Sequence, residues 1–237
     1  MPAPDEQSPA ILRIRARETN CYLVRAAAGT ILVDPGPPGS AAAIKAGAAA
    51  AGVEPGEIRL ILVTHGHLDH YGAAGDVQAW CGAPVAAHPL ALELSRDRRS
   101  ALPPAQTLQG SLVRWAFLLL APLFPFAPLD ASFLLEEDAD LSAYGPEGRT
   151  ILLSGHAPGS LGILTAQGDA LVGDLLVNYV VPSKPLYMAD GAAWQQSYEH
   201  LRSLQPRRVY VGHGEPFDGE GLAHIYPSRS QFRWWVR

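Results

Sequence analysis

The sequence contains few cysteines, few lysines and no long run of charge of one sign. Two cysteines, Cys21 and Cys81, occur in 237 residues, far apart and without C-x-x-C spacing. This spacing argues against a disulfide framework and a cysteine metal site. Eighteen basic residues, of which two are lysines, stand against 23 acidic ones, for a formal net charge of −5. We therefore expect no nucleic-acid partner, because nucleic-acid-binding proteins present basic patches.

The sequence also lacks the pattern of a secretory signal and of a membrane span. Residues 1–9 carry neither a basic segment nor an apolar one, so we expect a cytoplasmic protein. The most apolar stretch, residues 112–129, includes Arg114 and three prolines, which argues against a transmembrane helix. It belongs to an apolar insertion at about residues 96–130. Three interpretations stay open: a core segment, a lid over the substrate, or a patch in peripheral contact with a membrane.

Apolar residues make up 48% of the chain, which is enough for the core of a single domain spanning residues 1–237. Their spacing predicts two groups of strands with accompanying helices. The predicted strands are 10–17, 21–24, 30–33, 58–63, 84–87, 150–154, 161–165, 170–173 and 208–211, and the longest predicted helices are 40–51 and 192–204. This order is typical of an α+β protein with two mixed β-sheets flanked by helices, an αββα sandwich.

A dense cluster of histidines follows the apolar strand at 58–63. The run His65-x-His67-x-Asp69-His70 places three imidazoles and a carboxylate within six residues. Imidazole nitrogens and carboxylate oxygens are ligands that zinc and iron accept. In a loop, alternate residues face different sides, so His65 and His67 can serve one ion while Asp69 and His70 serve a neighbour. The spacing permits a two-metal site.

Three further polar residues follow other predicted strands. These are His156, Asp174 and His213. If the strand ends meet at one edge of the sandwich, His65, His67 and His156 would hold a first ion, and Asp69, His70 and His213 a second. Asp174 would then bridge both. We expect two divalent metal ions, zinc first, with iron and manganese as alternatives.

With these residues the sequence resembles the metallo-β-lactamase fold superfamily of hydrolases. The resemblance rests on the H-x-H-x-D-H run at 65–70, on Asp34 in Val-Asp-Pro-Gly, and on the glycine-flanked His156, Asp174 and His213, all in the order of that superfamily. It implies that all seven ligand positions are filled. It also implies that Asp34 orients the metal loop from outside the ligand set, although an aspartate before Pro-Gly is equally a turn residue. Tyr179 is a weak candidate for substrate binding.

The resemblance implies a metal-dependent hydrolase acting on a small-molecule substrate, closest to the glyoxalase II-like or lactonase-like branches. A hydroxide bridging the two ions would attack an ester, thioester or lactone, and Asp69 would orient it and transfer its proton. If the apolar stretch 112–129 folds over the metal edge, an apolar acyl group would be favoured.

Two alternatives stay open. A persulfide dioxygenase-like oxidoreductase would use one iron, held by His65 or His67 with His156 and Asp174. A non-catalytic protein would only bind its metals. The tail at 232–236, with Trp234 and Trp235, either packs on the core or forms a homodimer contact.

Overall fold

The computed structural model describes residues 10–97, 105, 111, 112, 114–116, 119 and 127–225. Most of the stretch 112–129 and all of the tail at 232–236 lie outside the described residues, so the predictions that depend on them, an apolar acyl substrate, a membrane-facing patch and a homodimer, stay predictions. The same holds for a single domain spanning residues 1–237. Within the insertion, the described side chains of Leu112, Trp115 and Leu119 are exposed, which argues against a core position for these three.

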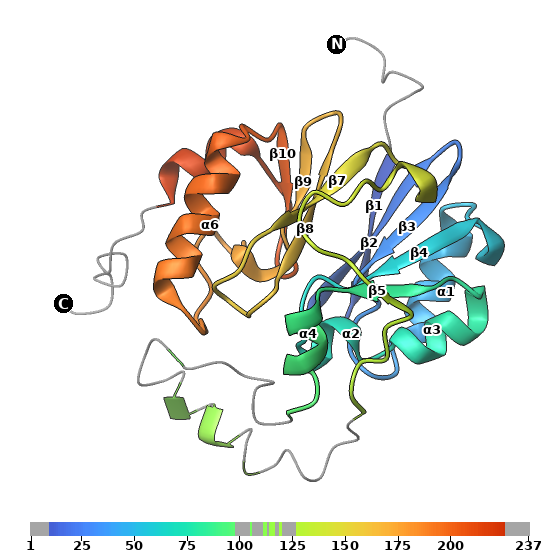
Figure 1. Ribbon diagram of the computed structural model, residues 1–237, viewed down its shortest axis with the longest axis horizontal. Coiled ribbons are helices and arrows are strands. Elements are labelled where there is room, and N and C mark those ends of the chain that lie inside the picture. The colour runs from blue at the N-terminus through green and yellow to red at the C-terminus, as the bar shows by residue number, and fades with distance from the viewer. Residues whose placement is uncertain are drawn as a thin grey trace.

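The strands form two stacked sheets, which confirms the predicted sandwich (Figure 1). In the described residues, the order of the first sheet follows the sequence: β1 (Ala10–Ala16), β2 (Thr19–Ala26), β3 (Gly29–Val33), β4 (Ile58–Leu62), β5 (Val85–Ala87) and β6 (Phe133–Leu134). The second sheet has the order β11 (Phe217–Asp218), β10 (Arg208–Tyr210), β9 (Asp169–Leu171), β8 (Leu161–Thr165) and β7 (Gly148–Leu152). Both sheets are mixed, with antiparallel pairs β1–β2 and β7–β8 and parallel pairs β3–β4 and β9–β10.

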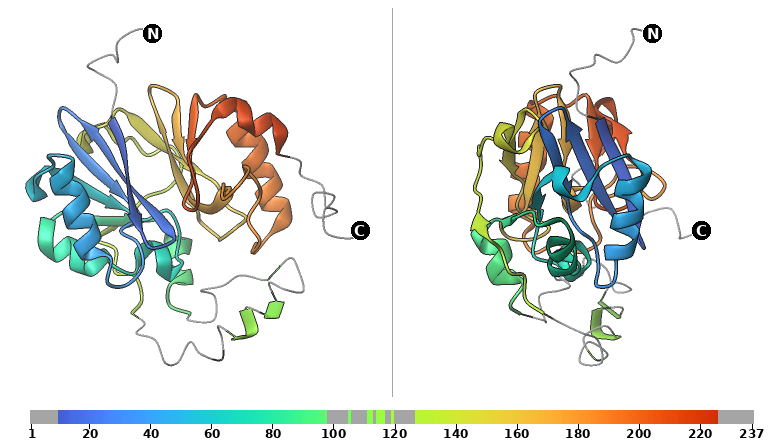
Figure 2. Two further views of the ribbon diagram at one scale, coloured as in Figure 1. Left: turned by 180° about the vertical axis from the view of Figure 1, so that it is seen from behind. Right: turned by 90° about the vertical axis from the view of Figure 1, so that its right-hand side faces the viewer.

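Helices cover the outer face of each sheet. Figures 1 and 2 show α1 and α3 against the first sheet and α6 against the second. The described α-helices are α1 (Ala41–Ala50), α2 (Leu68–Tyr71), α3 (Ala74–Cys81), α4 (Pro89–Leu94) and α6 (Gly191–Ser203). Short 3-10 helices are η1 (Pro55–Glu57), η4 (Ser142–Tyr144), η5 (Gly173–Leu175) and η6 (Gly219–His224). None of the described helices is both long and apolar enough to span a membrane.

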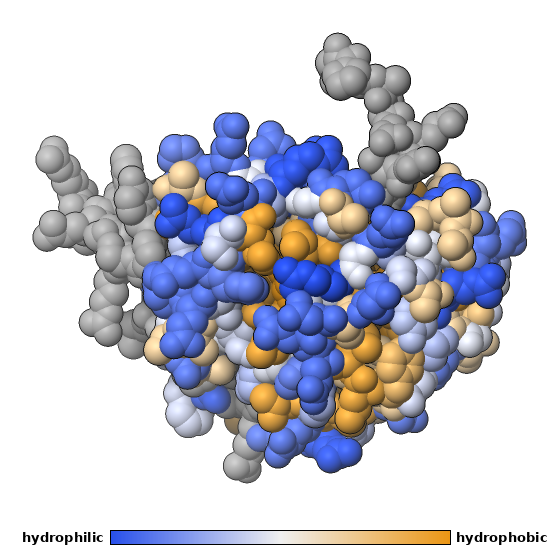
Figure 3. Space-filling model, turned by 45° about the horizontal axis from the view of Figure 1, so that its top comes forward, coloured by the Kyte–Doolittle hydropathy of each residue, from blue (hydrophilic) through white to orange (hydrophobic). Residues whose placement is uncertain are grey.

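Three apolar layers hold the sandwich together. Ile44 of α1 and Val77 of α3 pack in a buried cluster on the first sheet, while Tyr198 of α6 packs with the second sheet. A middle cluster joins the facing sides of the two sheets and includes Ile31 of β3 and Leu171 of β9. On the face shown in Figure 3, hydrophilic side chains surround the hydrophobic ones. The apolar pattern of the strands thus fixes how the two sheets stack, and with it which strand ends meet.

One local prediction about the histidine run is wrong. Asp69 and His70 were expected in a loop, but they lie in the short helix α2. His67 precedes this helix in an extended conformation, with φ −91° and ψ 139°, and Gly72 ends it. The turn reverses the chain between His67 and His70, so the two side chains reach different parts of the cluster. A helix of four residues, such as α2, is too short to show a helical periodicity in its sequence.

Candidate metal centre

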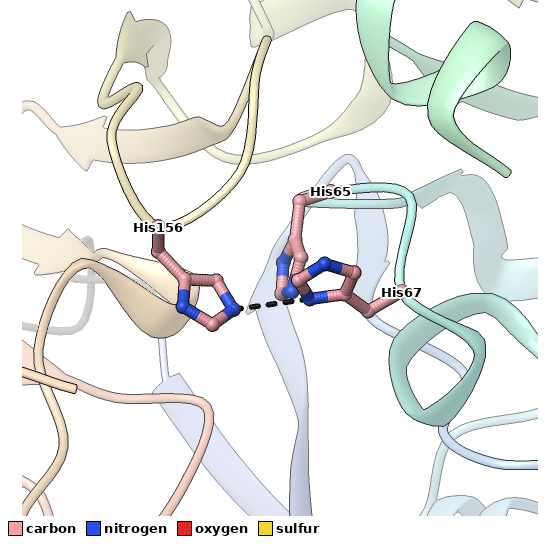
Figure 4. A group of neighbouring side chains, drawn as sticks. All are labelled: His65, His67 and His156. Atoms are coloured by element: carbon pink, nitrogen blue, oxygen red, sulfur yellow. Dashed lines mark hydrogen bonds between the residues drawn. The ribbon is translucent and has the colours of Figure 1, made fainter. Parts of the chain in front are cut away.

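Three histidines from two halves of the molecule face one another at the edge of the sandwich. His65 and His67 follow β4, and His156 comes from the loop between β7 and β8; their rings point toward a common space (Figure 4). His67 Nδ1 lies 3.0 Å from His156 Nε2. One ligand atom of each residue lies within 4.8 Å of those of the other two. All three side chains are buried, so the group offers three nitrogen ligands out of contact with bulk water.

A second group lies beside the first and combines two histidines with a carboxylate. It consists of Asp69, His70 and His213, whose ligand atoms also lie within 4.8 Å of one another. His213 Nε2 lies 3.3 Å from His70 Nε2 and 3.3 Å from Asp69 Oδ2. The Asp69 side chain is 46% exposed. This half of the centre is therefore open to solvent and to a substrate.

Asp174 connects the two groups. Its Oδ2 atom lies 3.5 Å from His156 Nε2 and 3.3 Å from His213 Nε2, and its Oδ1 atom lies 3.5 Å from His70 Nε2. The carboxylate reaches this place because η5 follows β9 and turns Asp174 inward. Gly212 leaves space for this carboxylate, because a Cβ atom at position 212 would lie 2.2 Å from Asp174 Oδ1. The glycine beside His213 thus permits the close approach that its position in the sequence suggested.

Hydrogen bonds outside the cluster orient two of the histidines through Asp34. Its Oδ1 accepts the backbone N–H of Thr64 at 2.7 Å, and its Oδ2 accepts the Thr64 hydroxyl at 2.7 Å and His70 Nδ1–H at 2.8 Å. Because the Thr64 hydroxyl donates to Asp34, it accepts from Nδ1–H of His65, 3.0 Å away. The Nε2 lone pairs of His65 and His70 are thereby directed into the centre, an arrangement common around metal-bound histidine.

Backbone carbonyls orient two of the other three imidazoles in the same way. His156 Nδ1 donates to the carbonyl of Tyr187 at 2.8 Å, and His213 Nδ1 donates to the carbonyl of Glu18 at 2.8 Å. Both rings therefore present Nε2 to the cluster. Four of the five imidazoles have their outward nitrogen occupied by a hydrogen-bond acceptor, which leaves the inward nitrogen available as a ligand.

Two buried atoms in the centre have no hydrogen-bond partner among the described residues. They are His65 Nε2 and Asp174 Oδ1. Buried polar atoms are nearly always paired, because an unpaired one costs about 1–3 kcal/mol. Both atoms point into the cluster and both are metal-ligand atoms. The residues present thus fit a bound cation, which would satisfy the two orphaned lone pairs.

The two groups differ in their protonation. Burial, with the neighbouring imidazoles, lowers the pKa of His65 far below its usual range and that of His67 to about 3. Burial also opposes the charged forms of His70 and His213, but the surrounding carboxylates, Asp174 above all, outweigh it and raise their pKa to about 10 and about 12. In the metal-free protein at neutral pH, the first group is neutral and the second holds protons between carboxylates.

A set of hydrogen bonds, which we call the hairpin clamp, ties the His213 loop to the first sheet. Asn20 of β2 donates through Nδ2 to the carbonyls of Val211 and Gly214, at 2.9 and 2.7 Å, and its backbone N–H donates to Gly212 O at 2.7 Å. Arg13 adds a hydrogen bond to Gly214 O at 3.0 Å. Thr64, Asn20 and Arg13 were not among the predicted site residues. Asn20 and Arg13 contact residues that lie roughly 190 to 200 positions further along the chain, and nothing in the sequence indicates such a contact.

Tyr179 lies beside the second group. Its ring stacks against that of His213, with centroids 6.3 Å apart and planes 25° apart, and its side chain is 62% exposed. Asn178 holds the neighbouring backbone, since its N–H donates to His213 O at 3.0 Å. Tyr179 thus lies at the open side of the centre, and its role in substrate binding stays a prediction.

The described part of the chain thus combines an αββα fold with a His/Asp cluster at its edge that could hold metal ions. A profile of the Metallo-beta-lactamase superfamily matches residues 14–213. The chain belongs to this superfamily.

Individual relatives agree with that assignment. The protein named "Probable metallo-hydrolase YflN" of Bacillus subtilis (strain 168) is 28% identical over 210 residues, which cover 81% of this chain and 78% of that protein. Hydroxyacylglutathione hydrolase of Anaeromyxobacter dehalogenans (strain 2CP-C) is 44% identical over 72 residues, 30% of this chain and 26% of that protein. Among solved structures, TTHA1623 in a di-iron-bound form is 30% identical with a TM-score of 0.65, covering 91% of this chain and 96% of that one.

Proposed function

We propose that this protein is a metal-dependent hydrolase that cleaves an ester, thioester or lactone bond of a small-molecule substrate. The observation that carries the proposal is the position of the Asp174 carboxylate between two complete ligand groups. His65, His67 and His156 would hold one divalent ion, and Asp69, His70 and His213 a second, with Asp174 shared. Zinc is the ion we expect first. Iron is tested beside it because TTHA1623 was solved in a di-iron-bound form, and manganese completes the set.

Two ions held in this way supply Lewis-acid chemistry and lower the pKa of bound water toward neutrality. The chain's own residues supply the rest. His213 and His70, in their neutral forms, direct Nε2 inward because Glu18 O and Asp34 hold their other nitrogen. In the metal-free protein, burial opposes ionisation of Asp69, but the charges of His70 and His213 outweigh it and lower its pKa. Its carboxylate is ionised and partly exposed, so it can hydrogen-bond to a water molecule at the centre and would pass a proton from that water to a leaving group.

Names of relatives support a hydrolytic reaction. YflN is named as a metallo-hydrolase, and the partial match to hydroxyacylglutathione hydrolase favours a thioester as one candidate bond. The oxidoreductase alternative requires one iron on His65 or His67 with His156 and Asp174. It assigns no role to the complete group of Asp69, His70 and His213, so we give it second place.

Metal analysis followed by a substrate panel tests the proposal. Protein purified without added metal is analysed for zinc, iron and manganese, and is then assayed with esters, thioesters, lactones and a persulfide. About two equivalents of metal with turnover of an acyl substrate is the expected result. One equivalent of iron with oxygen uptake on the persulfide would establish the oxidoreductase instead. A metal-replete protein that turns over nothing in the panel would leave a metal-binding role only.

Metal loading should release protons, and only from one of the two groups. At pH 7.5 the ligands His65 and His67 are already neutral, whereas His70 and His213 hold protons because their pKa values lie near 10 and 12. Since a metal binds the deprotonated form, the second ion should displace about one to two protons, and its affinity should rise with pH. Calorimetric titration in two buffers of different ionisation enthalpy measures this number.

The matched control for proton release is His67→Gln. This change removes a neutral ligand, so the protons released by the remaining group should stay the same, while His213→Gln should lower their number. Full loading of the unaltered protein without any proton release at pH 7.5 would contradict the assignment of the two protonation states.

A further inference from the structure

Arg17 occupies a strained position in the tight turn between β1 and β2. Ala16 and Thr19 are paired across the two strands, so Arg17 and Glu18 form the whole turn. Arg17 has a φ of 60°, and Glu18 is outside the left-handed region. A two-residue hairpin turn with positive φ at its first residue favours glycine there, because a Cβ atom is crowded in that conformation. Strained residues of this kind are concentrated at functional sites.

The Arg17 side chain makes no polar contact that stabilises the described part of the fold. It is exposed, and no hydrogen bond or ion pair joins its guanidinium to the described part of the chain. The two arginines of the preceding strand β1 differ: Arg13 and Arg15 both bind the carboxylate of Glu215, the former at 2.8 Å. A free guanidinium in a conformation that favours glycine calls for an explanation outside folding.

A pocket beside the metal centre supplies that explanation. It has a volume of about 210 Å³, and Arg17, Arg15, Asn178, Tyr179 and Gly214 are among its lining residues. Tyr179 stacks against the His213 ring, and Gly214 follows His213 in the chain. The turn itself touches the centre, since Glu18 O accepts from His213 Nδ1. A ligand group in this pocket lies next to the open half of the metal centre.

The charges around the pocket favour an anion. Two guanidiniums, those of Arg15 and Arg17, and two carboxylates, those of Glu18 and Glu215, line the pocket, and Arg13 binds Glu215 from outside the lining. Glu215 is already engaged by two of the arginines. With Arg13 included, the local charges sum to +1, although the protein as a whole carries −5. Glu18 also lines the pocket and is the one carboxylate there without an ion pair in the described residues. Its negative charge should repel an anion, so removing that charge tests whether the pocket binds an anion.

We infer that Arg17 determines specificity by binding an anionic group, a carboxylate or a phosphate, carried by the substrate. A planar guanidinium binds either group through two parallel hydrogen bonds. The inference rests on the proposed function for the position of the bond that is cleaved, but the anion site itself requires only the pocket and the free arginine. The substrate class is thus an ester or thioester whose acyl part ends in an anion.

Arg17→Gly tests the inference because it should raise thermal stability while it lowers selectivity for the anionic substrate. Glycine relieves the turn, so Tm should rise by about 2–4 °C. The ratio of kcat/KM for 4-nitrophenyl hemisuccinate to that for 4-nitrophenyl butyrate should fall about tenfold, since one charged hydrogen-bonded contact is lost. Arg17→Ala should lose the same selectivity without the gain in Tm.

Binding to the metal-free protein gives a readout that does not depend on turnover. Succinate and inorganic phosphate are titrated separately by calorimetry, which tells a carboxylate site from a phosphate site. Arg17→Gly should weaken the binding of the preferred anion about tenfold, and Glu18→Gln should strengthen it. Gln205→Gly is the matched control, because Gln205 also has positive φ, 48°, but lies after α6, away from the pocket. It should raise Tm without changing anion binding.

The outcomes separate this inference from the proposed function. Unchanged anion affinity and an unchanged substrate ratio in Arg17→Gly would overturn the anion site, even if Tm rises. Loss of anion affinity in Arg17→Gly supports it. If the metal-loaded protein cleaves no acyl substrate, the proposed function fails, and the titrations of the metal-free protein still decide whether Arg17 binds an anion.

Discussion

Replacing Asp174 by alanine should remove metal and activity together. Asp174 is the side chain that lies within 3.5 Å of ligand atoms from both groups, so each ion would lose a ligand and the charge that balances it. We expect the metal content to fall from about two equivalents to below one, and kcat/KM to fall by about 10³-fold or more. Elemental analysis and steady-state kinetics on the same preparation measure both quantities.

Two further variants separate the loss of a ligand from the loss of the fold. Asp174→Asn keeps the shape of the side chain and removes its charge, so it should lose metal while retaining the circular dichroism spectrum of the parent. Asp76→Ala removes an exposed aspartate from α3 and should leave both quantities unchanged. An Asp174→Ala protein that has lost its metals yet keeps full turnover would refute the hydrolase proposal.

Asp34→Asn should show the second large effect, although Asp34 is in neither ligand group. Its carboxylate accepts three hydrogen bonds, from Thr64 N–H, the Thr64 hydroxyl and His70 Nδ1–H. An amide presents an N–H₂ group to at least one of these donors and so leaves that donor buried and unpaired. We expect about 2–4 kcal/mol less stability in the metal-free protein, and metal affinity lower by about 10–100-fold.

Urea unfolding and competition with a chromophoric chelator measure these two effects. Asp138→Asn is the matched control: Asp138 shares the residue type and the positive φ, 59° against 55° for Asp34, but is exposed and pairs with Arg149. It should leave metal affinity unchanged. If Asp34→Asn lost stability while both ions bound as tightly as before, Asp34 would be a structural residue and not one that orients the ligands.

The sequence was sufficient to predict the fold class and the residues that meet at the centre, for a physical reason. His65, His156, Asp174 and His213 each follow an apolar strand, and strands that stack in a sandwich bring their ends to one edge. Short motifs and strand patterns are local, so they can be read from one sequence. The helix α2 was missed because four residues carry no period. Strands β6 and β11, with two residues each, were missed for the same reason.

What supports the centre was far less predictable. Two histidines are oriented by backbone carbonyls, those of Tyr187 and Glu18, which any residue type provides. Asn20 and Thr64 act through contacts that exist only after the sheets have stacked. Asp34 was a predicted candidate because of the resemblance, yet its three hydrogen bonds were not foreseeable from a turn sequence. The outer contacts of a site are set by tertiary structure, and ordinary residue types serve in them.

The division of ligands between the two halves of the chain has a consequence for how the protein comes apart. His65, His67, Asp69 and His70 belong to the first sheet's half, whereas His156, Asp174 and His213 belong to the second. Neither half contains a full ligand group, so an ion bound at the edge would cross-link the two halves. Because each ligand group is complete only when the two halves are together, free metal in excess of its dissociation constant stabilises the folded molecule by mass action. Without metal, the hydrogen bonds of the hairpin clamp would still hold the two halves together.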